Sequence, residues 1–218
     1  MADLTLSADR TLPLRILCLG AHSDDIEIGC GGTLLKLSHS YADLHVRWIV
    51  FSADQDRRRE AEESAAAFLE GVAARQVNIL DFRDGYFPYD GAAIKDYFEQ
   101  LKAEMQPDLI FTHCRYDLHQ DHRTLCDLTW NTYRSHLILE YEIAKYDGDL
   151  GAPNVFMGLD AALCERKVNY LLQFFGTQRS KHWFTRETFM ALMRLRGVEA
   201  KATGGYAEAF YGRKIELA

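Results

Sequence analysis

The sequence of 218 residues lacks several features that would assign it to a familiar class. No apolar run approaches the roughly 18 residues that a membrane-spanning helix needs. There is no excess of positive charge either. The formal net charge is −7, which argues against nucleic acid as a partner because such binding depends on neutralising phosphates.

The cysteines are few and unpaired in pattern. The five are scattered and form no Cys-x-x-Cys pair, and three lie in or beside apolar runs. This pattern predicts buried free thiols in a reducing compartment. Residues 1–13 are polar and mixed in charge, unlike a secretory signal. We therefore expect a cytoplasmic protein without a membrane span.

Two nucleotide-binding patterns are also missing. Gly20 and the glycines of 29–32 do not give G-x-G-x-x-G at a strand end, and no P-loop occurs. These glycines need another explanation.

What the sequence does contain is an alternation of apolar runs and helix-forming stretches. Strands are expected at 14–19, 45–52, 76–82 and 108–113, and helices at 32–40, 57–69, 92–105 and 121–137. This rhythm predicts an α/β fold with a mostly parallel sheet flanked by helices.

Beyond residue 137 the pattern changes. Short strands are expected at 140–146 and 155–159, helices at 161–175 and 186–196, and an irregular tail at 204–210. We expect a single domain over 1–218, whose C-terminal elaboration, from about 138 to 218, builds part of a substrate pocket.

Chemistry-bearing side chains gather in two segments, each directly after a predicted strand. Residues 21–33 read AHSDDIEIGCGGT, which suggests a tight loop, and residues 113–122 read HCRYDLHQDH. In a parallel sheet both segments emerge at the carboxyl edge, where open α/β sheets place their active sites. So many carboxylates at the end of a buried strand are costly unless compensated, and we expect a divalent metal ion as the compensator.

Three ligands are predicted for this ion. His22 and Asp25 lie three residues apart, and His122 completes the set. Three protein ligands with an open position are typical of catalytic zinc. A mixed nitrogen and oxygen set also admits Fe²⁺, cobalt or manganese.

The neighbours of these ligands suggest catalysis. Asp24 is expected to act as the general base. His119 shares a helix face with His122 and can stabilise an oxyanion or protonate a leaving amine. Asp121 is expected to orient an imidazole. Any one of these residues alone is more often a cap or a surface polar group, but the two clusters together indicate hydrolysis of an amide or ester carbonyl.

The two segments together resemble the A-H-P-D-D-x-E-x-G-x-G-G-T and H-x-x-D-x-H-x-D-H signatures of PIG-L-type (LmbE-like) zinc-dependent N-deacetylases. One departure is Ser23 where proline is usual, which we expect to affect loop rigidity. The resemblance implies a Rossmann-like fold and removal of an acetyl group from an N-acetylated amino sugar or its conjugate. It also implies metal on His22, Asp25 and His122, with Asp24 as base and His119 as its partner.

Substrate-binding residues are less clear in the sequence. The resemblance suggests Arg59 as a contact to substrate hydroxyls. Tyr141 could line a sugar site or pack a short sheet. Gln178 and Lys181 belong to a polar and aromatic stretch typical of a carbohydrate-facing loop. The resemblance also makes a homo-oligomer, trimer or hexamer, a state to test.

Two other functions stay open at this point. One is a metal-dependent amidohydrolase acting on a non-sugar amide. The other is a non-catalytic Rossmann-like binding module with a structural metal. Asp24 and His119 count against the second, because a structural site does not use them.

Overall fold

The computed structural model describes residues 12–215. Residues 1–11, most of the segment described above as unlike a secretory signal, lie outside the described part, as do 216–218. The centre is a seven-stranded sheet in the order β3-β2-β1-β4-β5-β7-β6. Its strands are β1 (Leu14–Gly20), β2 (Leu44–Val50), β3 (Ala74–Ile79), β4 (Leu109–His113), β5 (Leu137–Tyr141), β6 (Val155–Leu159) and β7 (Tyr206–Gly212).

The first five strands are parallel, whereas β7 pairs antiparallel with both β5 and β6. The predicted α/β class with a mostly parallel, Rossmann-like sheet is therefore confirmed. The helices are α1 (Asp25–Ser40), α2 (Gln55–Phe68), α3 (Gly91–Glu104), α4 (Gln120–Thr132), α5 (Ala161–Phe174) and α6 (Arg186–Glu199), with a short 3₁₀ turn, η1 (Gly176–Gln178).

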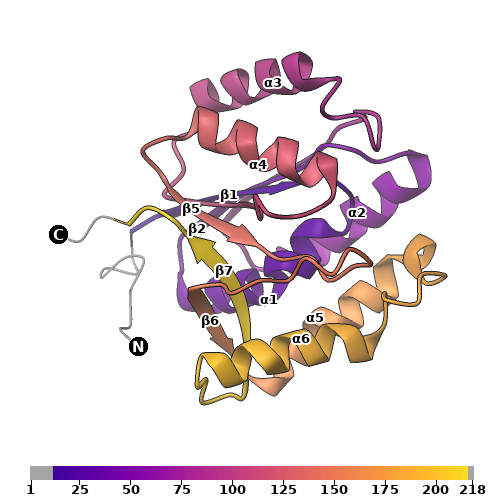
Figure 1. The fold of residues 1–218 in the computed structure, drawn as a ribbon. Coiled ribbons are helices and arrows are strands. Elements are labelled where there is room, and N and C mark those ends of the chain that lie inside the picture. The colour runs from indigo at the N-terminus through magenta and orange to yellow at the C-terminus, as the bar shows by residue number, and fades with distance from the viewer. Residues whose placement is uncertain (1–11, 216–218) are drawn as a thin grey trace.

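The helices form a layer on each side of the sheet (Figure 1). Helices α3 and α4 cover one face, and α1, α2 and α5 cover the other. The central strand β1 serves both cores: Ile16 and Cys18 point to one and Leu17 and Leu19 to the other. A strand buried on both faces needs a continuous apolar run, and this explains the composition of β1.

Helix α1 begins seven residues earlier than expected. The segment 25–33, interpreted above as part of a loop, is helical and almost entirely buried. A Cβ atom at Gly29 would lie within 3.0 Å of the Tyr141 ring, and one at Gly31 would meet Phe68 equally closely. The glycines therefore allow a helix to pack tightly, despite their low helix propensity.

The C-terminal tail also differs from expectation. Residues 206–212 form β7 between β5 and β6, not an irregular segment. The charged Glu208 interrupts the apolar pattern that would indicate a strand. Its side chain is buried, accepts hydrogen bonds from the backbone of Gly32 and Thr33, and pairs with Lys167 at 2.6 Å. Residues from 137 onward thus extend the same sheet.

Two smaller predictions concern helix ends and thiols. Helix α4 ends at Thr132, before the expected end at residue 137. Helix α6 continues past its expected end at residue 196 and through Gly197, which packs against the backbone of Gly205. All five cysteines are buried and free, as expected. No helix among the described residues 12–215 is long and apolar enough to cross a bilayer.

Candidate metal centre and active site

Three side chains converge where the two signature segments leave the sheet. His22 follows β1, Asp25 opens α1, and His122 lies in the first turn of α4. The Nδ1 atom of His22 lies 3.1 Å from Nε2 of His122 and 3.4 Å from Oδ2 of Asp25, and the last two atoms are 3.5 Å apart. Ligand atoms bound at about 2.0–2.1 Å around a tetrahedral zinc ion are spaced about 3.3 Å apart, so these three atoms fit one ion.

Other donors crowd the same place, so the groups that could hold an ion overlap. His113 Nε2 lies 3.2 Å from Asp25 Oδ2, and the His113 ring stacks on that of His122. However, the Nε2 atom accepts a hydrogen bond from the backbone N–H of Ala21 at 3.0 Å. Because its lone pair is used in this way, His113 fits a supporting position better than a ligand position.

Carboxylates hold both ligand imidazoles from behind. Nδ1 of His122 lies 2.9 Å from Oδ2 of Asp117. Nε2 of His22 lies 3.0 Å from Asp84 and 3.4 Å from Asp121. Asp121 is itself fixed by the backbone N–H groups of residues 85 and 87. Partners of this kind fix the orientation of a ligating histidine, and Asp121 is placed to orient His22.

The charges of these side chains suit a bound cation. Burial opposes protonation of His22, but hydrogen bonds to Asp121, Asp25 and Asp84 outweigh burial and raise its pKa well above the ordinary value. Burial lowers the pKa of His122 to about 3. Burial also opposes ionisation of Asp25, yet the charges of the neighbouring histidines hold its pKa well below its usual range. The carboxylates around His22 therefore favour a positive charge at this ring, which either a proton or a bound metal ion can supply.

Asp24 precedes α1 without capping it through its side chain. Its Oδ1 atom lies 3.4 Å from Nη2 of Arg57. Burial, together with the charge of Asp25, raises the pKa of Asp24. A carboxyl group with a raised pKa beside a metal site is suited to accept and return a proton.

Ser23, the departure from the family signature, takes part in this arrangement. Its hydroxyl accepts a hydrogen bond from Nε of Arg57 at 3.0 Å. The serine thus fixes the arginine that faces Asp24, whereas the sequence suggested an effect on loop rigidity alone. A proline at this position would leave the contact unmade.

His119 is the N-cap of α4, and its ring lies near those of both His22 and His122. The Nδ1 atom accepts a hydrogen bond from the backbone N–H of Asp121 at 3.3 Å. A neutral His119 therefore carries its proton on Nε2. Burial, with the charge of His22 adding to it, lowers the pKa of His119 and favours this neutral form.

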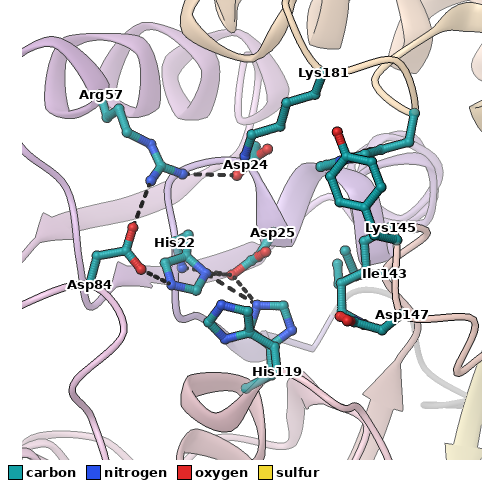
Figure 2. Close-up of a pocket in the computed structure, with 13 residues that line it drawn as sticks. His22, Asp24, Asp25, Arg57, Asp84, His119, Ile143, Lys145, Asp147 and Lys181 are labelled. Carbon is teal, nitrogen blue, oxygen red and sulfur yellow. Dashed lines mark hydrogen bonds and ion pairs between the residues drawn. The ribbon is translucent and has the colours of Figure 1, made fainter.

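A pocket of about 290 Å³ opens above these groups. Figure 2 shows Arg57 entering from the left of the view, Lys181 descending from the top with its end beside Asp24, and Lys145 and Asp147 on the right. The residues that line it are His22, Asp24, Asp25, Arg57, Asp84, His119, His122, Ile143, Lys145, Tyr146, Asp147, Lys181 and Trp183. Its volume is near the lower limit for small-molecule sites.

Comparison with known proteins identifies the family to which this chain belongs. The model of PIG-L, described as GlcNAc-PI de-N-acetylase, matches residues 17–133, which is more than half of the chain. The chain belongs to the PIG-L family. The match includes the three predicted metal ligands, Asp24 and His119.

Individual proteins and solved structures are also similar to this chain. Diacetylchitobiose deacetylase of Thermococcus kodakarensis is 29% identical over 123 residues, which cover 50% of this chain and 45% of that protein. The chain spans 45 to 61% of the length of the curated relatives it matches. The solved N,N'-diacetylchitobiose deacetylase from Pyrococcus horikoshii is 26% identical, with a TM-score of 0.66 over 94% of this chain and 87% of that one.

A further structure shares the fold alone. GalB, a 4-carboxy-2-hydroxymuconate hydratase from Pseudomonas putida, aligns with a TM-score of 0.72 at 15% identity, covering 94% of this chain and 98% of that one. The fold therefore does not identify the reaction by itself.

The PIG-L match ends before one wall of the pocket begins. The loop after β5 and the segment before α6 supply residues 143, 145–147, 181 and 183, all beyond residue 133. That residues from about 138 onward build part of a substrate pocket stays a prediction, and this wall is the observation that supports it. Lys181 is the one predicted substrate-binding residue that lines it.

Three predicted substrate-binding residues lie elsewhere. Arg59 is exposed outside the pocket, and Arg57, two residues earlier, is the arginine that lines it. Tyr141 is fully buried and donates its hydroxyl to the carbonyl of Leu19 at 2.6 Å, so it supports the site from below. Gln178 is 97% buried and does not line the pocket.

Sequence reasoning also missed groups that the structure brings to the site. Asp84 follows β3 and lines the pocket, and the rule that located the other clusters, at the carboxyl end of a parallel strand, applies to it as well. Asp117 lies within the second signature and contacts His122. Lys145 gave no signal, because it meets its partners only in the folded chain.

Proposed function

We propose that this protein is a metal-dependent hydrolase that removes the acetyl group from an N-acetylated amino sugar or a conjugate of one. The proposal is supported by membership of the PIG-L family and by similarity to two proteins named as diacetylchitobiose deacetylases. The observation that carries it is local. Three metal donors, a carboxyl group with a raised pKa and a neutral imidazole line the same pocket.

The donor set fits a divalent ion. His22, Asp25 and His122 offer two nitrogens and one oxygen at mutual distances of 3.1–3.5 Å, and a carboxylate stands behind each imidazole. We propose zinc as the native ion, although the same donors also bind Fe²⁺. Such an ion supplies Lewis acidity and lowers the pKa of a water molecule bound to it.

The remaining steps use residues of the chain. Asp24 accepts the proton of the attacking water and later delivers it to the amine that leaves. His119, with its proton on Nε2, donates a hydrogen bond to the carbonyl oxygen as that oxygen becomes negative. Asp121 keeps its backbone N–H directed at Nδ1 of His119 and so maintains this tautomer. The amide carbon–nitrogen bond breaks, giving acetate and a free amino group.

Polar groups around this centre suit a sugar. The side chains of Arg57, Asp84 and Lys181 combine donors and acceptors on one side of the pocket. Hydroxyl groups of a pyranose could join this network, in which Arg57 lies 3.4 Å from Asp24 and 3.5 Å from Asp84. A simple acylated amine has no hydroxyl groups to offer it, which favours the sugar over a non-sugar amide.

The first test is the metal content of tag-free protein by elemental analysis. We expect about one zinc or iron ion per chain, lost in His122→Ala and retained in the control His45→Ala, a histidine that contacts Asp43 and does not line the pocket. Protein that neither contains a metal nor binds added zinc would contradict the proposed centre.

The second test is turnover. N-acetylglucosamine, N,N'-diacetylchitobiose and acylated simple amines are compared by detecting the released amine. Asp24→Asn should retain its metal and lose about 10²- to 10⁴-fold in turnover. Asp127→Asn, an exposed aspartate on α4, is the matched control and should not change the rate. Wild-type turnover by Asp24→Asn would remove Asp24 as the base, and equal turnover of simple amides would favour the non-sugar alternative.

A further inference from the structure

The loop after β5 forms part of the pocket wall and is held in place by side chains. Ile143 and Ala144, at its start, are buried. The next residues, 145–150, are named here the wall loop, and three of them line the pocket. Within the described residues 12–215, no backbone–backbone hydrogen bond uses a residue of the wall loop. Its position therefore depends on side-chain contacts.

One set of these contacts closes the base of the loop. Glu142 accepts a hydrogen bond from the backbone N–H of Gly151 at 3.2 Å. Arg196, on α6, donates to the carbonyl of Gly151 at 2.9 Å and pairs with Glu142 at 2.8 Å. These contacts fix the residues that flank the wall loop and leave its centre to other groups.

Lys145 holds the centre. Its Nζ atom lies 2.5 Å from Oδ2 of Asp149, in the same loop, and 3.0 Å from Oδ1 of Asp117, in the segment that leads to the metal centre. The same oxygen of Asp149 accepts the backbone N–H of Leu118 at 2.7 Å. No more than 8% of any of these three charged side chains is exposed. The ammonium group therefore joins the wall loop to the segment that precedes α4.

The charges make this lysine essential to the contact. In the part of the chain that the structure describes, no other lysine or arginine nitrogen lies within 4.0 Å of the carboxylate of Asp117 or Asp149. Burial opposes the charge of Lys145, but the charge of Asp117 and hydrogen bonds to both carboxylates outweigh burial and raise its pKa. Without this cation two buried carboxylates would face each other with no counter-charge between them, which is strongly unfavourable. The wall loop would then move outward, because that exposes its own carboxylate to water.

We propose that Lys145 is a positioning residue, which holds the wall loop against the metal centre and so determines how tightly the substrate is bound. This inference rests on the proposed deacetylase function and adds a residue that controls substrate binding. Tyr146 and Asp147 follow Lys145 and line the pocket, and the Tyr146 ring lies 6.3 Å from that of Trp183 in the other half of the wall. Figure 2 shows Lys145 and Asp147 across the pocket from Arg57. Release of the wall loop displaces this side of the pocket.

The metal centre should not depend on the lysine. In its absence Asp117 keeps its contacts with Nδ1 of His122 at 2.9 Å and with the backbone N–H of His119 at 2.8 Å. Lys145→Met should therefore retain its metal by elemental analysis. Its KM should rise about tenfold, with kcat within about threefold of wild type, on the acetylated sugar that the wild-type enzyme hydrolyses best. Lys145→Arg keeps the charge and should restore most of the KM, and Lys102→Met, an exposed lysine on α3, should change neither parameter.

A structural measurement tests the contact without relying on the reaction. Chymotrypsin is added to metal-loaded protein, and cleavage after Tyr146 is compared with cleavage after Tyr89, an exposed tyrosine in the loop before α3. Cleavage after Tyr146 should be about tenfold faster in Lys145→Met than in wild type, because the loop opens more often, while cleavage after Tyr89 stays the same. Asp149→Ala releases the wall loop without leaving a buried carboxylate unpaired. It should give the same KM and the same cleavage, and it replaces Lys145→Met if that variant does not fold.

The outcomes separate the proposal from its alternatives. Unchanged cleavage after Tyr146 in both variants would overturn it even if KM rises, because Lys145 would then contact the substrate directly. Loss of metal, or a fall in kcat at unchanged KM, would also overturn it, because Lys145 would then act on the metal centre. So would faster cleavage with unchanged KM and kcat. If no acetylated sugar is hydrolysed but Lys145→Arg restores the slow cleavage that Lys145→Met loses, the proposed reaction fails and the contact that holds the wall loop stands.

Discussion

Asp117 offers a direct test of how the metal centre is held. Its carboxylate is buried and accepts from Nδ1 of His122 at 2.9 Å through one oxygen. The other oxygen accepts from the backbone N–H of His119 at 2.8 Å and lies 3.0 Å from Nζ of Lys145. Asp117→Asn preserves the size of the side chain while removing the charge from all three contacts.

The expected loss is in metal affinity. Removing a carboxylate behind a ligating histidine typically weakens metal binding by 10- to 100-fold, or about 1.4–2.7 kcal/mol. Hydrogen bonding to His122 and the charge of that histidine overcome the effect of burial and lower the pKa of Asp117, so the wild-type group is ionised throughout the neutral range. The effect should therefore persist unchanged between pH 6 and 8.

The fold should survive the substitution. Lys145 keeps its contacts with Asp149 at 2.5 Å and with Asp147, so its ammonium group is not left without a counter-charge. Competition with a chromogenic chelator measures the affinity, and Asp147→Asn is the control because Asp147 contacts Lys145 but no ligand histidine. An Asp117→Asn affinity within twofold of wild type, or an equal loss in Asp147→Asn, would refute the reasoning.

Four further predictions follow from the same structure. Hydrogen bonds raise the pKa of His22 despite its burial, so metal binding near pH 7 should release about one proton. Calorimetry in buffers of different ionisation enthalpy measures this release. The apparent metal affinity should also fall as the pH falls. The same raised pKa should stabilise the metal-free protein fully below about pH 6.5 and progressively less as pH rises through the folded value; a flat thermal profile with no proton release would contradict both. Gly29→Ala should lower the free energy of unfolding by about 1–3 kcal/mol in denaturant titrations. Gly91→Ala is the control and should cause no such loss, because a Cβ atom there meets nothing within 4 Å. Equal losses in the two variants would argue against tight packing at α1. Arg57→Met should reduce kcat/KM about tenfold or more, whereas Arg59→Met should leave it unchanged. The reverse result would favour the expectation that Arg59 contacts the substrate.

The sequence predicted those parts of the protein that depend on local pattern. Alternating apolar runs and helix formers are enough to indicate a parallel sheet, because strands such as β1 must be apolar on both faces. The same topology explains why His22 and His122, a hundred positions apart, could be expected to meet, and their ring nitrogens lie 3.1 Å apart.

What the sequence did not predict depends on packing partners. The glycines of α1 indicate a loop unless the Tyr141 and Phe68 rings above them are known. Glu208 makes β7 look irregular because its partner, Lys167, lies on α5. In both cases a long-range contact reverses a local preference.

Arg57 lines the pocket and Arg59, the arginine expected to contact substrate, does not, and the reason is geometric. Both belong to α2, and two residues along a helix rotate a side chain by about 200°. Only one of the two can face the pocket, and a run of three arginines gives no information about helix phase. The start of α2, which is set by the cap that Asp54 provides to the N–H of Arg57, decides the matter.

The division of the pocket has a consequence for specificity. The centre lies within residues 17–133, where the family match is found, and the opposite wall comes from residues 143–183, outside it. The GalB hydratase has the same fold and is named for a different reaction. The fold alone therefore determines neither the reaction at the centre nor the substrate that the wall accepts. If the metal donors, Asp24 and His119 carry the chemistry, substitutions in the wall should change which substrate is used more than how fast the amide is cleaved. Lys181 is the exception within the wall, because its positive charge acts on Asp24 and opposes the rise in the pKa of that carboxyl group, so a substitution there should also affect the chemistry.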